Sequence, residues 1–332
     1  MKKICWWQTS FGEKEIKRIS NSIRNKNISL GKITNKFEKN LAKFLKVDNV
    51  IAVTSGSSAL LISLLAIGIA PGDEIILPNR TWIATAHAVK ILGATPIIVD
   101  VQSELPIIDT SKIINKITNK TKAIIPVHIN GRSADLKSIK AIAKKYNLYV
   151  VEDAAQAIGS CNRDGYLGTQ SDIGCFSLSV VKTVSTGQGG FVATNNSYLA
   201  KKIKSIRTHG IENVKDPKRW EMLGFNFRFN DILASIGIEQ LKRIDKRIDH
   251  LKKIYEIYKK ELNGSPFKLI PVNIDKGEVP VYNEFLVEKR NQWITKLFKK
   301  GIETRPFYPD INQANYLFIN NKHKIKTSIY QR

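Results

Sequence analysis

Cysteine, glycine and proline are scarce in this sequence of 332 residues, which contains 3 Cys, 20 Gly and 11 Pro. So little Gly and Pro excludes a collagen-like or low-complexity chain, and 42% hydrophobic residues disfavour a disordered one. The odd number of cysteines, without a Cys-x-x-Cys motif, indicates reduced thiols in a cytosol. The five histidines include no His-x-x-x-His pair, so we expect no metal site.

Long apolar runs are also missing. None approaches the ~18 residues that a membrane-spanning helix needs, and the basic N-terminus lacks the apolar stretch of a secretory signal. We therefore expect a cytoplasmic protein that does not associate with membranes. The length allows about two domains on the usual prior of ~150 residues per domain.

Acidic residues are few, 29 against 53 Lys and Arg, which leaves a net charge of +24. Such an excess would permit nucleic-acid binding by a non-catalytic regulator. The lysines, however, are spread over predicted helix faces, at residues 39, 43 and 46, 137 to 145, and 252 to 260. This pattern favours solvated surfaces, so we expect no specific nucleic-acid partner, whereas a small substrate bearing phosphate fits either interpretation.

Strand-like and helix-like apolar patterns alternate through the first 210 residues. Helices are predicted at residues 57–67, 84–92 and 136–146, and strands at residues 50–54, 74–78, 96–100, 123–127 and 148–153. The strands are continuous runs of Ile and Val, which indicates that both of their faces are covered. The pattern predicts an α/β fold with a doubly wound, mostly parallel sheet.

One long helix is predicted over residues 231–262, with Gly264 as its stop. It either forms a coiled-coil seam in a dimer or braces two domains. Its apolar residues step by three, four or five rather than in strict heptads, which favours the brace.

The segments after this helix predict a small α+β domain, with apolar stretches at 267–272, 281–287 and 302–308 and a helix at 292–300. Gly301 is well placed to end that helix. We therefore divide the chain into a large domain, residues 1–240, and a small C-terminal domain, residues 241–332.

A strand, a turn containing Gly56 and a helix start follow one another at residues 53–60. Exposed N–H groups and hydroxyls at a helix start can bind a phosphate. The simpler alternative is that Ser57 or Ser58 caps the helix. The dinucleotide motif Gly-x-Gly-x-x-Gly and the nucleotide motif Gly-Lys-Ser/Thr are absent.

Two ionisable residues, Asp153 and Lys182, stand beside apolar runs of the sequence. Asp153 follows a buried strand, where ligands of open α/β sheets bind, and could hold a protonated ring nitrogen or merely cap a helix. Lys182 stands between apolar residues and a Gly-rich turn, so burial would favour its neutral amine, the form that makes a Schiff base. Pyridoxal phosphate requires three features together: a phosphate-binding site, a carboxylate and a lysine shielded from solvent.

Ordered blocks from about residue 11 to residue 308 resemble the DegT/DnrJ/StrS-type sugar aminotransferases, pyridoxal-phosphate enzymes of fold type I. They include Ser-Gly-Ser-Ser-Ala-Leu at 55–60, Pro-Val-His at 126–128, Glu-Asp-Ala-Ala-Gln at 152–156 and Gly-Phe-Asn-Phe-Arg at 224–228. The resemblance implies a large domain with a mostly parallel mixed sheet, a smaller α+β C-terminal domain and a homodimer with shared active sites.

The resemblance also implies roles for single residues. Lys182 would carry the cofactor and serve as general base, while Asp153 would pair with the ring nitrogen. Trp82 would stack on the ring and Gln156 would contact the ring oxygen. The remaining cofactor-binding positions would be Ser55, Gly56, Ser57, Ser177 and, from the partner chain, Asn226. Substrate contacts are expected from His128, His209 and Arg305, although a structural role for His128 stays equally open.

The implied reaction moves the amino group of glutamate, through pyridoxamine phosphate, to a nucleotide-linked sugar of the 4-keto-6-deoxy type. The product would serve the biosynthesis of surface polysaccharide or another glycan. A sugar dehydratase on the same fold is the alternative, but those relatives carry His in place of Lys182. Residues after Tyr308 show no clear family match, so we expect a small domain that is shortened or divergent.

Overall fold

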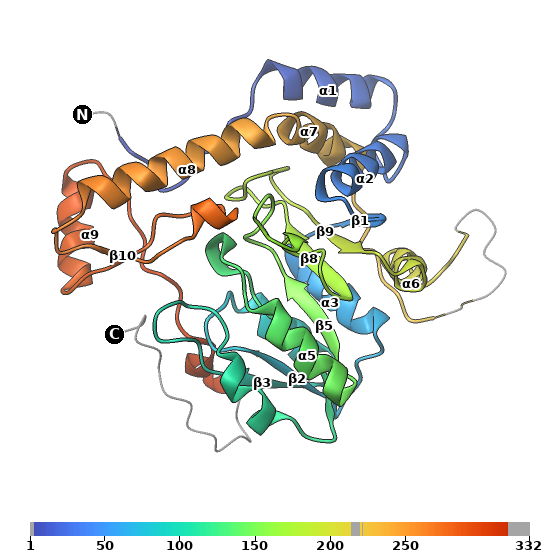
Figure 1. Cartoon of the computed structure of the whole chain (residues 1–332). Helices are drawn as coiled ribbons and strands as arrows, with labels where there is room; N and C mark the ends of the chain where they lie inside the picture. The colour runs from blue at the N-terminus through green and yellow to red at the C-terminus, as the bar shows by residue number, and fades with distance from the viewer. Residues whose placement is uncertain (1–2, 214–219, 221, 318–332) are drawn as a thin grey trace.

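A seven-stranded sheet with the order β1-β9-β8-β5-β4-β2-β3 forms the centre of the computed structural model, which describes residues 3–213, 220 and 222–317 (Figure 1). Strand β9 pairs antiparallel with both of its neighbours, and all other neighbouring pairs are parallel. The predicted α/β fold with a mostly parallel mixed sheet is thereby confirmed. The strands are β1 (Asn49–Val53), β2 (Glu74–Pro78), β3 (Thr95–Val99), β4 (Thr121–Ile124), β5 (Tyr149–Asp153), β8 (Ile173–Ser177) and β9 (Gly190–Thr194).

Helices cover both faces of the sheet because alternate strand residues on each face are apolar. Ile51 and Val53 of β1 belong to a core with α3 (Gly56–Ala66), α4 (Ala84–Ile91) and α6 (Ser197–Arg207). Their neighbours Val50 and Ala52 belong to the core of the opposite face. That face is covered by α2 (Lys32–Leu45) and α7 (Asp231–Leu241) and, farther along the sheet, by α5 (Leu136–Tyr146).

The single long helix predicted over residues 231–262 is wrong, because the structure has two helices there. Helix α7 ends at Leu241 and α8 (Ile244–Glu261) begins after Arg243, whose φ of −108° and ψ of 8° are not helical. The guanidinium of Arg243 bonds Glu15 of α1 (Glu13–Arg24) and the carbonyl of Ser10. Helix α7 is largely buried against α1 and α2, whereas α8 runs on toward the C-terminal segment (Figure 1).

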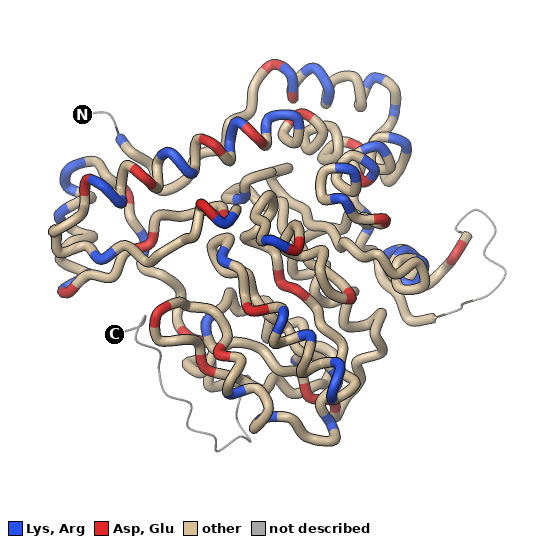
Figure 2. Tube along the Cα trace, viewed as in Figure 1, with Lys and Arg blue, Asp and Glu red and all other residues tan. Residues whose placement is uncertain are grey.

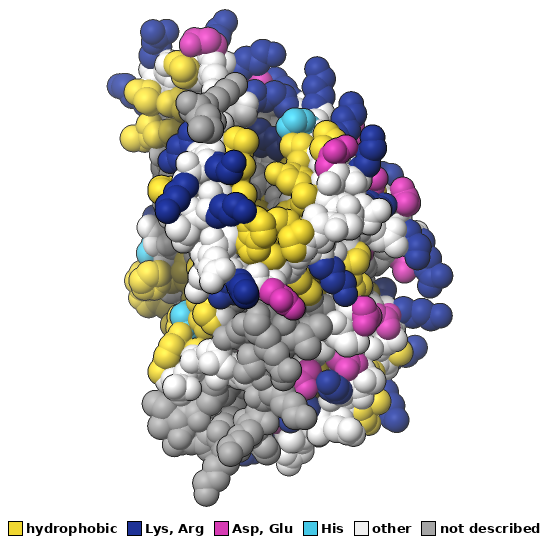
Figure 3. Space-filling model, turned by 90° about the vertical axis from the view of Figure 1, so that its left-hand side faces the viewer, with side chains coloured by type: hydrophobic (Ala, Val, Ile, Leu, Met, Phe, Trp, Pro, Cys, Tyr) yellow, Lys and Arg dark blue, Asp and Glu magenta, His cyan; other side chains and the backbone are white. Residues whose placement is uncertain are grey.

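The segment after α8 has little regular structure. Two of the predicted apolar stretches contain the short strands β10 (Lys268–Leu269) and β11 (Phe285–Leu286), and α9 (Arg290–Lys299) follows them. The third stretch, 302–308, forms an isolated bridge at Ile302 but no strand. Helix α9 has no buried residue, and Phe298 on it is 65% exposed. Hydrophobic side chains accordingly gather on this side of the molecule, bordered by Lys and Arg (Figure 3).

The chain then returns to the sheet, since Ile311 and Leu317 belong to the same core as β1. The domain boundary after residue 240 stays a prediction. The short elements that complete the described chain are β6 (Cys161–Asn162), β7 (Gly165–Tyr166), η1 (Thr110–Lys112), η2 (Ile114–Lys116), η3 (Ile129–Gly131), η4 (Ile274–Lys276), η5 (Ile311–Gln313) and η6 (Asn315–Leu317).

Basic residues are spread over many elements and alternate with acidic ones, most visibly along α8 (Figure 2). Among the described helices, none is both long and apolar enough to cross a bilayer.

Candidate active site

The N-terminus of α3 meets the end of β8 at one edge of the sheet. Ser55 is the N-cap of α3, and its Oγ accepts a hydrogen bond of 3.0 Å from the N–H of Ser58. The alternative that Ser57 or Ser58 caps this helix is therefore wrong. A Cβ on Gly56 would lie 2.9 Å from the Cβ of Ser177, so only glycine lets the helix start approach that strand so closely. The predicted cofactor-binding residues Ser55, Gly56 and Ser177 thus lie together, and Ser57 beside them is exposed.

Asp153 ends β5 at the same edge, and its carboxylate is buried at 5% exposure. The hydroxyl of Thr85 donates to its Oδ2 at 2.8 Å and the N–H of Ala155 to its Oδ1 at 3.2 Å. Burial raises the pKa of Asp153, and these hydrogen bonds offset part of the rise. No helix begins after Asp153, so it is not a helix cap. A buried carboxylate with two hydrogen-bond donors is suited to a protonated ring nitrogen.

Lys182 follows β8 and is half-buried beside the same edge. Burial lowers its pKa to about 8, against the opposing effect of the negative charge of Asp153. Within the described residues, no hydrogen bond or ion pair engages its Nζ. The side chain therefore offers an amine that is partly unprotonated near neutral pH, as covalent bonding to a carbonyl requires.

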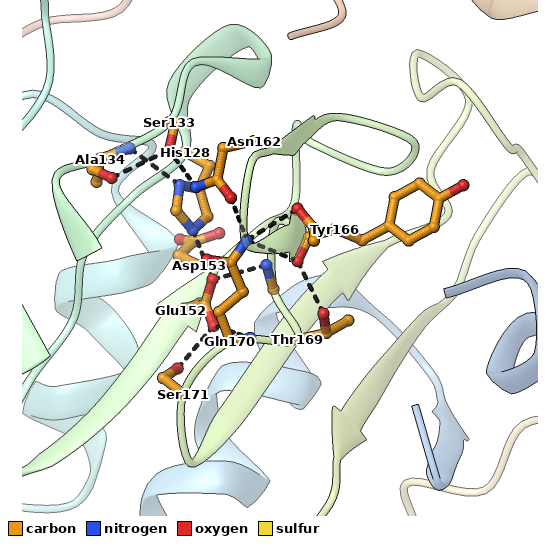
Figure 4. A network of polar contacts seen from close by, with 12 residues as sticks. His128, Ser133, Ala134, Glu152, Asp153, Asn162, Tyr166, Thr169, Gln170 and Ser171 are labelled. Carbon is orange, nitrogen blue, oxygen red and sulfur yellow. Dashed lines mark hydrogen bonds and ion pairs between the residues drawn. The ribbon is translucent and has the colours of Figure 1, made fainter. Parts of the chain in front are cut away.

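Behind Asp153 lies a polar network that sequence reasoning missed, centred on the fully buried side chains of Glu152 and His128 (Figure 4). Nε2 of His128 lies 2.8 Å from Oε2 of Glu152. Burial by itself would raise the pKa of Glu152, but hydrogen bonds from His128, Ser171 and Gly168 hold it below its usual value. The N–H of Ala134 donates to Nδ1 of His128 at 3.2 Å, so both ring nitrogens are engaged. This geometry favours the structural role that the sequence left open for His128.

Gln156 is held at both ends of its amide. Its Oε1 accepts from the N–H of Asn130 at 2.9 Å, and its Nε2 donates to the hydroxyl of Tyr308 at 3.3 Å. The rings of Tyr308 and Trp82 form a T-shaped pair, with 5.6 Å between their centroids. Trp82 is 58% exposed. Burial raises the pKa of Tyr308, so its hydroxyl stays protonated.

Three predicted residues make other contacts. Asn226 pairs with Thr208, and its Oδ1 accepts from Nε of Arg228 at 2.9 Å. His209 is exposed, with a φ of 60°. The guanidinium of Arg305 lies 4.5 Å from the ring centroid of Trp6. None of the hydrogen bonds or ion pairs in the described ranges joins Asn226, His209 or Arg305 to Asp153 or Lys182.

The residues present fit pyridoxal phosphate. A helix N-terminus with adjacent serine hydroxyls suits a phosphate, Asp153 suits the ring nitrogen, and Lys182 suits the carbonyl. In the part of the chain that the structure covers, no three His, Cys, Asp or Glu side chains are grouped to hold a metal ion.

Comparisons with known proteins agree with this geometry. The family model described as the DegT/DnrJ/EryC1/StrS aminotransferase family matches residues 9–329. The match continues past Tyr308, so the expectation that the family pattern stops there is wrong. GDP-perosamine synthase of Escherichia coli O157:H7 is 37% identical over 336 aligned positions, which cover 98% of this chain and 90% of the relative. The enzyme of the same name from Caulobacter vibrioides is 36% identical, covering 85% of this chain and 78% of the relative.

Solved structures show the same similarity. DesV of S. venezuelae superposes with a TM-score of 0.88 at 28% identity, covering 94% of this chain and 84% of the other. PseC of Helicobacter pylori, an aminotransferase involved in the biosynthesis of pseudoaminic acid, superposes with a TM-score of 0.92 at 25% identity. The superposition covers 98% of this chain and 90% of PseC.

Proposed function

This chain belongs to the DegT/DnrJ/EryC1/StrS aminotransferase family, and from that premise we propose that it aminates a keto sugar linked to a nucleoside diphosphate. The family match confirms the predicted class, a pyridoxal-phosphate-dependent aminotransferase. One observation supports the proposal most strongly: Lys182, Asp153 and the N-terminus of α3 lie together at the carboxyl ends of β5 and β8. We further propose glutamate as the amino donor.

Each residue of the site has a distinct task. Bound pyridoxal phosphate supplies an electron sink and carries the amino group between the two substrates. Lys182 would bond to the cofactor's carbonyl, and its Nζ would hold and return the proton at the reacting carbon. Asp153 keeps the ring nitrogen protonated. Gly56, Ser57 and Ser177 bind the phosphate, while the hydroxyl of Ser55 already serves as the helix cap.

The remaining contacts concern the ring and the substrate. Trp82 offers an exposed aromatic face on which the ring stacks. Gln156 presents an amide N–H to the ring oxygen. His209 and Arg305 stay predictions as substrate contacts, and the guanidinium of Arg305 makes a cation–π contact with Trp6.

We propose that the substrate is a GDP-linked sugar of the 4-keto-6-deoxy type and that the product enters a polysaccharide or another glycan. Relatives from three bacteria carry the name GDP-perosamine synthase, and they cover between 84% and 98% of this chain. Lys182 argues against the dehydratase alternative, whose members carry His at that position. The three unpaired thiols are compatible with the proposed cytoplasmic location.

A panel of keto nucleotide sugars tests this proposal. The purified protein with pyridoxal phosphate and glutamate is offered GDP-, dTDP- and UDP-linked 4-keto-6-deoxy sugars, and the amino sugar is detected by mass spectrometry. We expect turnover of the GDP-linked sugar above the others. Preference for another nucleotide would overturn the GDP assignment, and release of a dehydrated sugar without amination would favour the dehydratase.

We also propose that the enzyme is a homodimer in which Asn226 reaches the cofactor phosphate of the partner. The surface beside Asn226 is unusually apolar, with Phe225 67% and Leu223 78% exposed, which supports contact with a second copy. Co-expression of Lys182→Ala with Asn226→Ala chains tests this arrangement. In a mixed dimer one site keeps both residues, so two nearly inactive chains should regain activity together; verified mixed dimers that stay inactive would place Asn226 in its own chain's site or outside it.

A further inference from the structure

Asn130 occupies a position for which asparagine is unusually well suited. It is fully buried and lies in the left-handed region with a φ of 53°. Its Nδ2 donates to the carbonyl of Tyr282 and to Oε2 of Glu284, both at 2.9 Å, and its Oδ1 accepts from the N–H of Tyr282 at 2.7 Å. Every polar atom of the side chain is therefore bonded to the C-terminal segment, 152 to 154 residues away.

The backbone N–H of the same residue donates to Oε1 of Gln156 at 2.9 Å. A backbone N–H can only donate, so this bond decides which way round the amide of Gln156 lies. The Nε2 of Gln156 consequently faces the other way, toward Tyr308, as a donor.

The C-terminal segment also contacts Gly131 and Arg132, the two residues that follow Asn130. Arg132 donates to Oε2 of Glu284 at 2.6 Å and to the carbonyl of Pro271 at 2.7 Å. A Cβ on Gly131, whose φ is 77°, would lie 2.0 Å from the carbonyl oxygen of Val279, so the two backbones are in direct contact. Movement of residues 279–284 must therefore move Asn130.

We propose that Asn130 is a positioning residue. Through Asn130, the hydrogen bonds to Tyr282 and Glu284 in the C-terminal segment determine where the Nε2 donor of Gln156 lies. The inference rests on the proposed function, in which the Nε2 of Gln156 donates to the ring oxygen of the cofactor. Because a hydrogen bond to an oxyanion favours its ionised form, loosening Gln156 raises the pH at which that oxygen and the lysine–cofactor bond lose their shared proton.

The four variants of the main test leave the net charge unchanged. Asn130→Gly tolerates the positive φ and keeps the backbone N–H, but removes the ties to Tyr282 and Glu284. Asn147→Gly is the matched control, because Asn147 has the same φ of 53° at the C-cap of α5. Gln156→Ala and the double variant Asn130→Gly/Gln156→Ala complete a cycle.

Two quantities are measured. The first is the pH at the midpoint of the change in visible absorbance as each holoenzyme is titrated, and the second is the thermal unfolding temperature of each apoprotein. We expect Gln156→Ala to raise the midpoint by about one unit, Asn130→Gly to raise it by part of that amount, and Asn147→Gly to leave it unchanged. In the Gln156→Ala background, Asn130→Gly should add nothing.

An Asn130→Gly protein with a lower unfolding temperature but a normal midpoint pH would overturn the inference, as would additive shifts in the double variant. If Asn130→Gly does not fold, Asn130→Asp enters the same cycle, where an effect of its charge alone would persist without Gln156. A native protein that borohydride does not label at Lys182 in the presence of pyridoxal phosphate would overturn the proposed function, and this inference with it.

Discussion

The central sheet and the C-terminal segment after α8 are held in place by different forces. The sheet strands carry fully buried apolar side chains on both faces, such as Ile51, Ile76 and Phe191. The segment has two-residue strands and a helix with no buried residue, and Glu284 joins it to the sheet region through buried bonds with Asn130 and Arg132. Apolar burial dominates the first region, whereas the second combines fewer buried apolar residues, such as Val279 and Ile311, with buried polar contacts between distant residues.

Removal of Lys182 should have the largest effect, because it eliminates the reactive group at the sheet edge. We expect Lys182→Ala to lower activity at least about a thousandfold, since both the covalent bond and the proton transfer depend on its amine. Borohydride reduction with peptide mapping should label Lys182 in the native protein and no lysine in the variant. The exposed Lys140→Ala is the control, and labelling of another lysine would contradict the assignment.

One substitution made in both regions compares their packing directly. Phe191→Ala in β9 should lower the free energy of unfolding by about 3–5 kcal/mol, because Phe191 is fully buried and stacks on Phe176 at 4.4 Å. Phe298→Ala in α9 should lower it by less than about 0.5 kcal/mol. Urea unfolding of both variants measures the difference, and equal losses would refute the contrast between the regions.

Charge at the sheet edge is tested by Asp153→Asn. The neutral amide cannot stabilise a protonated ring nitrogen, so we expect a loss of about 3 kcal/mol of transition-state stabilisation, roughly a hundredfold in kcat. The cofactor should still bind through its phosphate, and absorbance after gel filtration checks this. Near-normal turnover would remove Asp153 from its role.

The smallest expected effect is a shift in the pH dependence of cofactor attachment. Burial lowers the pKa of Lys182 to about 8, so the rate constant for covalent attachment to the apoprotein should rise with pH and level off above about pH 8. Asp153 opposes this lowering, and Asp153→Asn should therefore move the plateau to lower pH. Stopped-flow absorbance measures both curves, and an unmoved plateau would show that the two charges do not interact.

The same lowered pKa has a consequence for stability. Between pH 8 and the ordinary lysine pKa of 10.5, the unfolded chain binds more protons at Lys182 than the folded chain does. The free energy of unfolding of the apoprotein should therefore rise with pH across this window, relative to that of Lys182→Met. Chemical unfolding of the two proteins at several pH values measures the difference.

Local signals were sufficient to predict five of the seven strands of the sheet, β1 to β5, but β8 and β9 were not predicted. Asp153 and Lys182 could be found because each stands beside a short apolar run. Thr85, Glu152 and Asn130 could not, because what singles them out is a bonding partner elsewhere in the chain: Asp153, His128 and Glu284, respectively. The break between α7 and α8 was missed for the same reason, since Arg243 bonds Glu15 of a distant helix.

By itself the sequence determined the α/β class, the placement of Asp153 at a strand end and the aminotransferase family, because apolar periodicity and ordered motifs are local. Tertiary structure alone decided the orientation of the amide of Gln156 and the place of the C-terminal segment. Buried donors and acceptors must find partners wherever the folded chain brings them, and no local pattern specifies a hydrogen bond between residues 130 and 284.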